Sequence, residues 1–147
     1  MADHPKPPRF NHVAMSVPAE LLDEQNRTDL LAFYGEVFGW QEAPGMTIDR
    51  QRLVLMAHRY DQFVFLIKDD APMTAPRLDH WGQAVSSREE LEALYDRTQR
   101  YREKDDRVDI VELSEESHPG VTIHSFYVRY LLPLMIETQF FAWDPAP

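Results

Sequence analysis

Two short segments of this chain nearly repeat each other, and each carries a histidine at its third position. The first is Phe10–Val17 (FNHVAMSV), and the second is Leu78–Val85 (LDHWGQAV), 68 residues further along the chain (80 − 12). Both segments are short and end just before a helical pattern, so both predict β-strands. The chain therefore reads as one module written twice, with His12 and His80 at equivalent strand positions.

Each of these two strands is followed by a pattern that predicts a helix and then three more strands, so the expected order is βαβββ twice. In the first module, residues 10–68, apolar side chains at helical spacing predict a helix that ends at Gly39. In the second module, residues 78–141, Ser87 and Glu90 form a capping-box pattern that opens a helix.

The expected boundaries follow from the same patterns. Strands are expected at residues 10–17, 40–43, 52–58 and 63–68, and again at 78–85, 108–113, 122–129 and 134–141. Residues 69–77 are expected to link the modules, residues 1–9 to form a flexible proline-containing lead, and residues 114–120 to form a polar loop. Residues 10–147 are then one compact domain.

Composition narrows the classes of partner. A chain of 147 residues is long enough to bury about two thirds of its unfolded surface in one domain. It has no cysteine, so a metal must be bound by His, Asp, Glu or backbone oxygen. The formal net charge of −10 argues against nucleic acid or an anionic membrane as partner. No apolar run has the roughly 18 residues of a spanning helix and no export leader opens the chain, so the expected localisation is cytoplasmic.

One carboxylate interrupts the last predicted strand. Glu137 stands among the apolar residues of Leu134–Phe141, where an ionised carboxylate is costly unless it is paired or binds a metal. The simpler interpretation is a solvated edge strand, because the alternation also lets Glu137 face water. The offset of 70 residues between two Arg-Tyr pairs, 59–60 and 129–130, aligns Glu137 with Ile67. The first module is therefore expected to have no matching carboxylate.

His12, His80 and Glu137 together predict a metal site. A single strand histidine is usually an ordinary polar residue, but two at equivalent positions with one carboxylate are more specific. Two imidazoles and one carboxylate on one face leave coordination positions open, as in non-haem Fe(II) oxygenases. We therefore predict one divalent metal ion, with Fe(II) favoured and Mn(II) or Zn(II) as alternatives.

The doubled βαβββ order, with histidines on the opening strands and Glu137 on the closing strand, resembles the vicinal oxygen chelate superfamily. That superfamily includes glyoxalase I, bleomycin-resistance proteins, fosfomycin-resistance enzymes and extradiol dioxygenases, and the resemblance covers residues 10–141. It implies an α+β fold in which two βαβββ modules form paired curved mixed sheets around a metal-binding cleft. It also implies a small organic substrate that is chelated through oxygen atoms.

The resemblance implies a homodimer as well. The apolar turn Tyr130–Leu134 replaces the polar turn that most superfamily members have there, and with Phe140, Phe141 and Trp143 it offers a candidate dimer surface. Two alternatives stay open at this point. The turn lines the mouth of the pocket, or it packs locally within its own chain.

Within the superfamily, the ligand set favours extradiol dioxygenases, which use two histidines and one glutamate, over glyoxalase I, which has a carboxylate in each half. The extradiol signature also matches in part, because His118 precedes Phe126-Tyr127 by seven residues and Glu137 lies ten residues after Tyr127. The resemblance implies that Tyr127 hydrogen-bonds a substrate oxygen and that His118 moves protons. The chain departs from the signature near His118 and after Tyr127, so His118 can also be a plain loop residue. His124 alternates with Tyr127 along the strand and is expected to face away.

Three functions are compatible with these residues. The first is extradiol-dioxygenase-like chemistry at Fe(II). The second is a lyase, isomerase or thiol transferase that uses Mn(II) or Zn(II) as a Lewis acid, since fosfomycin-type enzymes also bind their metal through two histidines and a glutamate. The third is a non-catalytic protein that sequesters an aromatic or antibiotic ligand.

Overall fold

Two four-stranded sheets, one from each half of the chain, form the framework of the protein. The computed structural model describes residues 5–145. The first sheet has the strand order β1-β4-β3-β2, with β1 parallel to β4 and the other pairs antiparallel. Its strands are β1 (His12–Val17), β2 (Gln41–Glu42), β3 (Arg52–Met56) and β4 (Phe63–Lys68).

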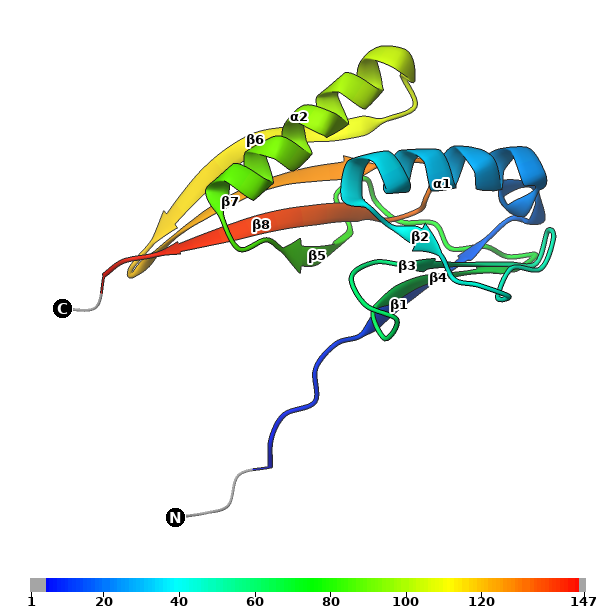
Figure 1. Ribbon diagram of the computed structural model, residues 1–147, viewed down its shortest axis with the longest axis horizontal. Helices are drawn as coiled ribbons and strands as arrows, with labels where there is room; N and C mark the ends of the chain where they lie inside the picture. The colour runs from blue at the N-terminus through cyan, green and yellow to red at the C-terminus, as the bar shows by residue number, and fades with distance from the viewer. Residues whose placement is uncertain (1–4, 146–147) are drawn as a thin grey trace.

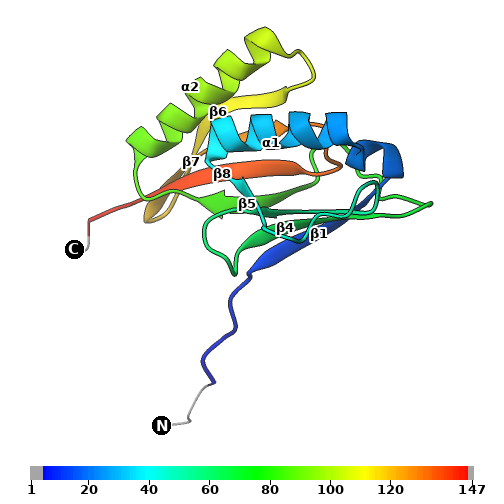
Figure 2. The ribbon, with the colours of Figure 1, turned by 45° about the vertical axis from the view of Figure 1, so that its right-hand side comes forward.

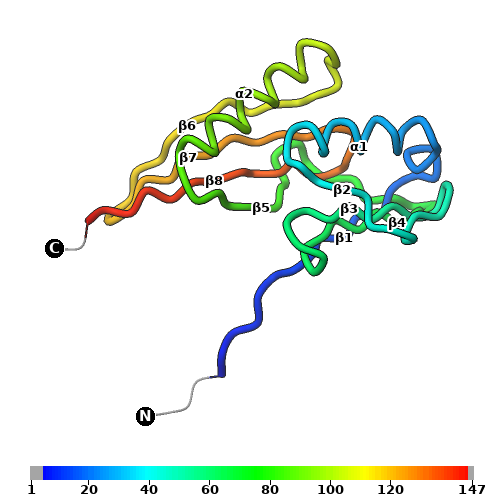
Figure 3. The backbone as a smooth tube through the Cα atoms, in the orientation of Figure 1, coloured from blue at the N-terminus to red at the C-terminus, as the bar shows by residue number. Residues whose placement is uncertain are grey.

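The second sheet repeats this topology in the order β5-β8-β7-β6, again with one parallel pair at its β5 edge. Its strands are β5 (His80–Ala84), β6 (Asp109–His118), β7 (Val121–Arg129) and β8 (Met135–Trp143). The expected βαβββ order of both halves is therefore confirmed, and so is the α+β fold. Residues 5–11 form no helix or strand and run away from both sheets (Figure 3), while residues 1–4 of the expected lead lie outside the described residues.

Both helices lie on the same side of the two sheets. Helix α1 (Glu24–Phe38), which follows a short 3-10 turn at Ala19–Leu22, and helix α2 (Arg88–Lys104) run above the sheets in Figures 1 and 2. Each strand alternates its side chains between two faces, so every second residue points toward the helices. We call the opposite, helix-free side of each sheet its open face.

The chain signals both ends of these helices in the expected way. Asp23 caps α1 by accepting the backbone N–H of Asn26 at 2.8 Å, and Ser87 caps α2 by accepting that of Glu90 at 3.1 Å. Gly39 ends α1 with φ +73°, a left-handed conformation that favours glycine. The predicted helix end at Gly39 and the predicted helix start at Ser87 are confirmed.

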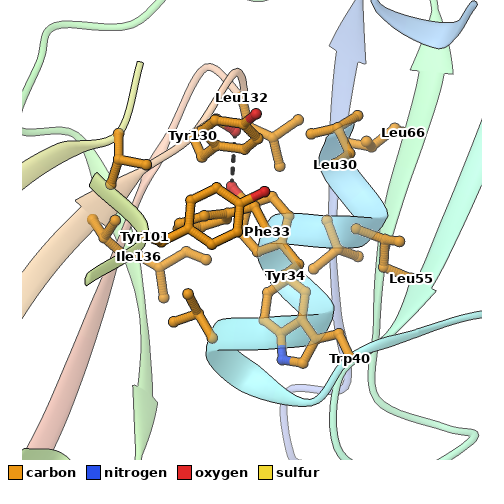
Figure 4. Packing of buried hydrophobic residues seen from close by; sticks show 14 of the residues in the cluster. Leu30, Phe33, Tyr34, Trp40, Leu55, Leu66, Tyr101, Tyr130, Leu132 and Ile136 are labelled. Atoms are coloured by element: carbon orange, nitrogen blue, oxygen red, sulfur yellow. Dashed lines mark hydrogen bonds between the residues drawn. The ribbon is translucent and has the colours of Figure 1, made fainter. Parts of the chain in front are cut away.

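The core is continuous between the two halves of the chain because α1 contacts both. Phe33 of α1 packs against Tyr101 of α2 and Tyr130, with ring centroids 5.0 and 4.5 Å apart. The hydroxyl of Tyr34, which is fully buried, donates to the backbone carbonyl of Tyr130 at 3.0 Å (Figure 4). Burial of each such aromatic side chain contributes about 1.5–3 kcal/mol, so the joint core holds the two modules together.

The apolar turn Tyr130–Leu134 belongs to this core and is not a free surface. Tyr130 is 1% exposed and Leu132 is 4% exposed, both packed with the helices of their own chain. The proposal that this turn is a dimer surface was therefore wrong, and packing within the chain is the correct alternative. The physical reason is that α1 and α2 lie close enough together to cover the turn (Figure 4). Trp143, in contrast, is 72% exposed.

The polar segment expected to be a loop at residues 114–120 is mostly strand. β6 continues to His118 and pairs with β7 through an irregularity between Val111 and Ser114. β6 is an edge strand, and an edge strand tolerates polar residues on both faces because water solvates them. The reversal is confined to a tight turn, in which Gly120 has φ +86°.

A buried ion pair ties the start of β6 to α1. Arg107 donates to Asp105 at 2.8 Å and to Asp29 of α1 at 3.0 Å, and Asp105 accepts the hydroxyl of Tyr130 at 2.6 Å. The Arg107 guanidinium holds the pKa of Asp105 well below its usual range. The charged form of Asp105 is thus the form that the folded chain stabilises.

Asp105→Asn should lower the free energy of unfolding at neutral pH by about 1–3 kcal/mol, because it removes a charged acceptor from Arg107 and Tyr130. The native pKa of Asp105 lies below its unfolded value, so its contribution is complete above about pH 5 and is lost as the pH falls. Urea unfolding at pH 7 and pH 3 measures this. The difference between wild type and variant should shrink at pH 3, and an unchanged difference would contradict the role given to Asp105.

Candidate metal centre

His80 and Glu137 meet on the open face of the second sheet. Gly82 pairs with Glu137 and His80 pairs with Met135, so the histidine and the glutamate lie diagonally on neighbouring parallel strands. The Nε2 atom of His80 is 3.3 Å from Oε2 of Glu137. The Glu137 side chain is 12% exposed and that of His80 is 38% exposed, so the pair is accessible from the open face.

The backbone determines which nitrogen of His80 is free. Its Nδ1 atom lies 2.8 Å from the carbonyl oxygen of Leu78. A carbonyl only accepts, so Nδ1 carries the proton and Nε2 keeps its lone pair when the ring is neutral. Metal-binding histidines are held in the same way, with the second ring N–H donated to a fixed acceptor.

Tyr127 completes this group from the neighbouring strand β7. It is the cross-strand partner of Glu137, and its ring meets the His80 ring edge-on at a centroid distance of 5.0 Å. Burial and a hydrogen bond to Glu137 raise the pKa of Tyr127 to about 12. The phenol therefore stays protonated at neutral pH and is available as a hydrogen-bond donor beside Glu137.

His12 occupies the corresponding place on the first sheet. Its Nδ1 atom lies 2.7 Å from Oδ1 of Asn11, and its ring stacks on Phe63 at a centroid distance of 4.8 Å. The carboxamide oxygen accepts, so His12 also directs Nε2 away from its fixed partner. Met15 and Val17 of β1 are buried under α1, which places His12, two strand positions out of phase with them by one residue, on the open face.

The described chain brings together two of the three predicted metal ligands. His80 and Glu137 are adjacent, whereas His12 belongs to the other sheet, and residues 5–145 contain no group of three or more His, Cys, Asp or Glu side chains that could hold a metal ion. His124 lies on the helix side, 8% exposed and stacked on Phe140, as the strand alternation predicted.

His118 lies far from Tyr127 and Glu137. It pairs with Val121 near the end of the β6–β7 hairpin, whereas Tyr127 pairs with Glu137 six residues further along β7. Six residues of strand span about 20 Å. The Nε2 atom of His118 is 3.2 Å from Oε1 of Glu116 and its side chain is 46% exposed. Within one chain, the geometry thus separates His118 from the other candidate residues.

The strand register corrects the position of the missing fourth ligand. Glu137 is two residues beyond Met135, the β8 partner of His80. The partner of His12 on β4 is Phe63, so the equivalent of Glu137 in the first module is Phe65, not Ile67. The offset between modules grows from 68 residues at the histidines to 72 at these strands (135 − 63), which a constant offset cannot follow. The first module still has no carboxylate at this place.

Sequence reasoning missed the groups that surround these candidates. Asn11 directly precedes His12 and could have been found as its neighbour, but the carbonyl of Leu78 leaves no trace in the sequence. A cluster of Arg77, Asp109 and Arg129 was also missed, although Arg129 shares a face with Tyr127 by simple alternation.

Comparison with solved structures finds the same fold in proteins with different activities. A glyoxalase/bleomycin resistance protein/dioxygenase from Alicyclobacillus acidocaldarius matches with a TM-score of 0.62 at 13% identity, over 90% of this chain and 91% of that chain. Lactoylglutathione lyase from Agrobacterium tumefaciens matches with a TM-score of 0.58 at 16% identity, over 91% and 95%. The fosfomycin resistance protein FosX from Listeria monocytogenes matches with a TM-score of 0.58 at 14% identity, over 91% and 93%.

This chain therefore has the glyoxalase/bleomycin resistance/dioxygenase fold, the fold of the vicinal oxygen chelate superfamily. The prediction of that fold is confirmed. No family model matches the sequence, and no curated protein matches it either. Among the described residues, neither helix is long and apolar enough to cross a membrane.

Proposed function

We propose that this protein is a metal-dependent enzyme that acts on a small oxygen-chelating substrate, with extradiol-dioxygenase-like chemistry as the leading reaction. The observation that carries the proposal is the matched presentation of His12 and His80. Both rings have Nδ1 held by an acceptor and Nε2 free on an open face, and Glu137 lies beside the second. Two imidazoles and one carboxylate suit Fe(II), Mn(II) or Zn(II).

We propose that the site is completed between two copies of the chain. His12 faces out from the open face of one sheet and the His80–Glu137 pair from that of the other. If the first sheet of one copy faces the second sheet of its partner, the three ligands come from two chains. The same contact would cover Ile67, which is 44% exposed, with a stable interface of about 1,200–2,000 Å².

The roles of the protein side chains follow from their contacts. A bound divalent ion would supply positive charge for two adjacent substrate oxygens and, with Fe(II), a position for O₂. Tyr127 holds a proton beside Glu137 and would donate it in a hydrogen bond to a substrate oxygen. Phe65, where a fourth carboxylate would stand, leaves one more coordination position open. His118 remains a candidate proton carrier only if a partner chain brings it to the site.

The other two functions are distinguished by metal content and oxygen use. A lyase, isomerase or thiol transferase would hold Mn(II) or Zn(II) in the same residues and consume no O₂. A binding protein would work without metal. Anaerobically purified protein should contain iron and consume O₂ with catechol in an oxygen-electrode assay. Zinc or manganese with no oxygen uptake would favour the Lewis-acid reactions, and metal-free protein that binds ligand would favour sequestration.

His12→Ala, His80→Ala and Glu137→Ala should each lower metal affinity at least about tenfold, because each removes one ligand. Metal content after dialysis against buffered Fe(II) or Zn(II) measures this by mass spectrometry. His124→Ala is the matched control, since His124 faces the helices, and it should keep the wild-type metal content. Equal occupancy in the His12 variant would exclude His12 from the site.

Phe65→Glu should strengthen metal binding and weaken oxygen-dependent turnover, because a carboxylate at this register fills a position that substrate or O₂ needs. Ile67→Glu, which adds the same charge two residues along the strand, is the control and should leave metal affinity near wild type. Calorimetric titration with Zn(II) and an oxygen-uptake assay measure the two effects. A stronger gain from Ile67→Glu would show that the constant-offset alignment was right.

Light scattering should give a mass of twice the 17.2 kDa chain. Phe63→Asp places a charge on the open face of the first sheet and should release single chains, because an unpaired charge in an interface is costly. Tyr60→Asp, in the exposed β3–β4 turn, serves as the control and should leave the mass unchanged. A wild-type particle of one chain mass at high protein concentration would contradict the shared site.

A further inference from the structure

Two arginines share one aspartate on the open face of the second sheet. Arg77, just before β5, donates from Nε and Nη2 to the Asp109 carboxylate at 3.0 and 2.7 Å. Arg129, at the end of β7, donates from Nη2 to the same carboxylate at 3.2 Å. Two guanidinium groups against one carboxylate leave a local excess of one positive charge, in a chain whose net charge is −10.

These guanidinium groups keep donors for a further anion. Each guanidinium has five N–H donors in a planar fork, and only three of the ten are used on Asp109. The Arg77 side chain is 52% exposed and that of Arg129 is 28% exposed. Arg107 shows the opposite balance, since it contacts the two carboxylates Asp29 and Asp105 and has no charge excess.

The cluster lies beside the candidate metal centre. Arg129 is two residues from Tyr127 on the same strand face, which corresponds to about 7 Å along β7. Asp109 pairs with Arg129, and the next row of the sheet holds Val111, Tyr127 and Glu137. A molecule bound near Tyr127 and Glu137 would therefore reach the free edges of the guanidinium groups with a short substituent.

We propose that Arg77 and Arg129 form a carboxylate-binding subsite, so that the substrate is a small organic acid whose carboxylate lies one row of the sheet away from its metal-binding oxygens. A guanidinium fork binds a carboxylate through two parallel hydrogen bonds, which selects an anion over a neutral analogue of the same size. Its role in substrate selection rests on the proposed function. Carboxylate binding by the arginines does not require the metal.

The first test compares benzoate with benzyl alcohol, a neutral molecule of similar shape. Calorimetric titration of the full-length protein, as purified and after chelation of metal, should show preferential binding of benzoate in both samples. Arg129→Gln and Arg77→Gln should each weaken benzoate binding at least about tenfold. Arg88→Gln, which breaks an exposed pair with Glu92 on α2, is the control and should bind benzoate like wild type.

The second test uses a change of opposite sign. Asp109 competes with a ligand carboxylate for the same donors, so Asp109→Asn should strengthen benzoate binding even though it removes the ion pairs. A network that only anchors the chain would lose stability on Asp109→Asn and gain no affinity, and that outcome would overturn the subsite. Equal binding of benzoate and benzyl alcohol by wild type would overturn it as well.

The metal content of the same samples separates the two proposals. Metal bound through His12, His80 and Glu137 without preferential benzoate binding would reject the subsite and leave the proposed function in place. Preferential benzoate binding that depends on Arg129, in protein that binds no metal, would reject the proposed function and keep the subsite.

Discussion

The packing of α1 against elements of both modules is the interaction on which the rest of the structure depends. Phe33 and Tyr34 of α1 contact Tyr101 and Tyr130 from the second half of the chain, and the hydroxyl of Tyr34 is bonded to the Tyr130 carbonyl. Burial of that phenol raises its pKa, so it remains a donor throughout the physiological range. Because this core takes the helix side of both sheets, the opposite sides stay free for chemistry.

The two open faces have different characters. That of the first sheet presents His12 beside Phe63 and Phe65, an apolar aromatic surface with one ligand. That of the second sheet presents His80, Glu137 and Tyr127, with Arg77 and Arg129 nearby, and is rich in groups that hydrogen-bond. An apolar surface opposite a polar one would exclude water and strengthen the electrostatic contacts of a substrate held between them. The pairing of unlike faces is what the proposed shared site requires.

Much of this arrangement could be predicted from the sequence because it depends on local patterns. The repeated strands around His12 and His80, the helix stop at Gly39 and the cap at Ser87 each depend on a few neighbouring residues. The strand alternation also placed Tyr127 and His124 on opposite faces correctly.

What the sequence could not provide depends on distant residues. The modules differ by insertions within each repeat, so the counterpart of Glu137 is Phe65, and only the pairing of β1 with β4 reveals it. The turn Tyr130–Leu134 was read as a dimer surface because its covering helices come from residues far away in the chain. The polar strand β6 resembled a loop because an edge strand needs no apolar face. Arg77 and Asp109 are 32 residues apart, and no local pattern joins them.

A mixing experiment tests the central claim, a metal site shared by two chains, most directly. His12→Ala and Glu137→Ala proteins are prepared separately, mixed under conditions that exchange subunits, and analysed for bound metal. In a twofold dimer, each mixed pair has one site with both defects and one intact site, so random exchange should restore metal to about a quarter of all sites. If each site is built within one chain, mixing restores none, and that result would contradict the shared site.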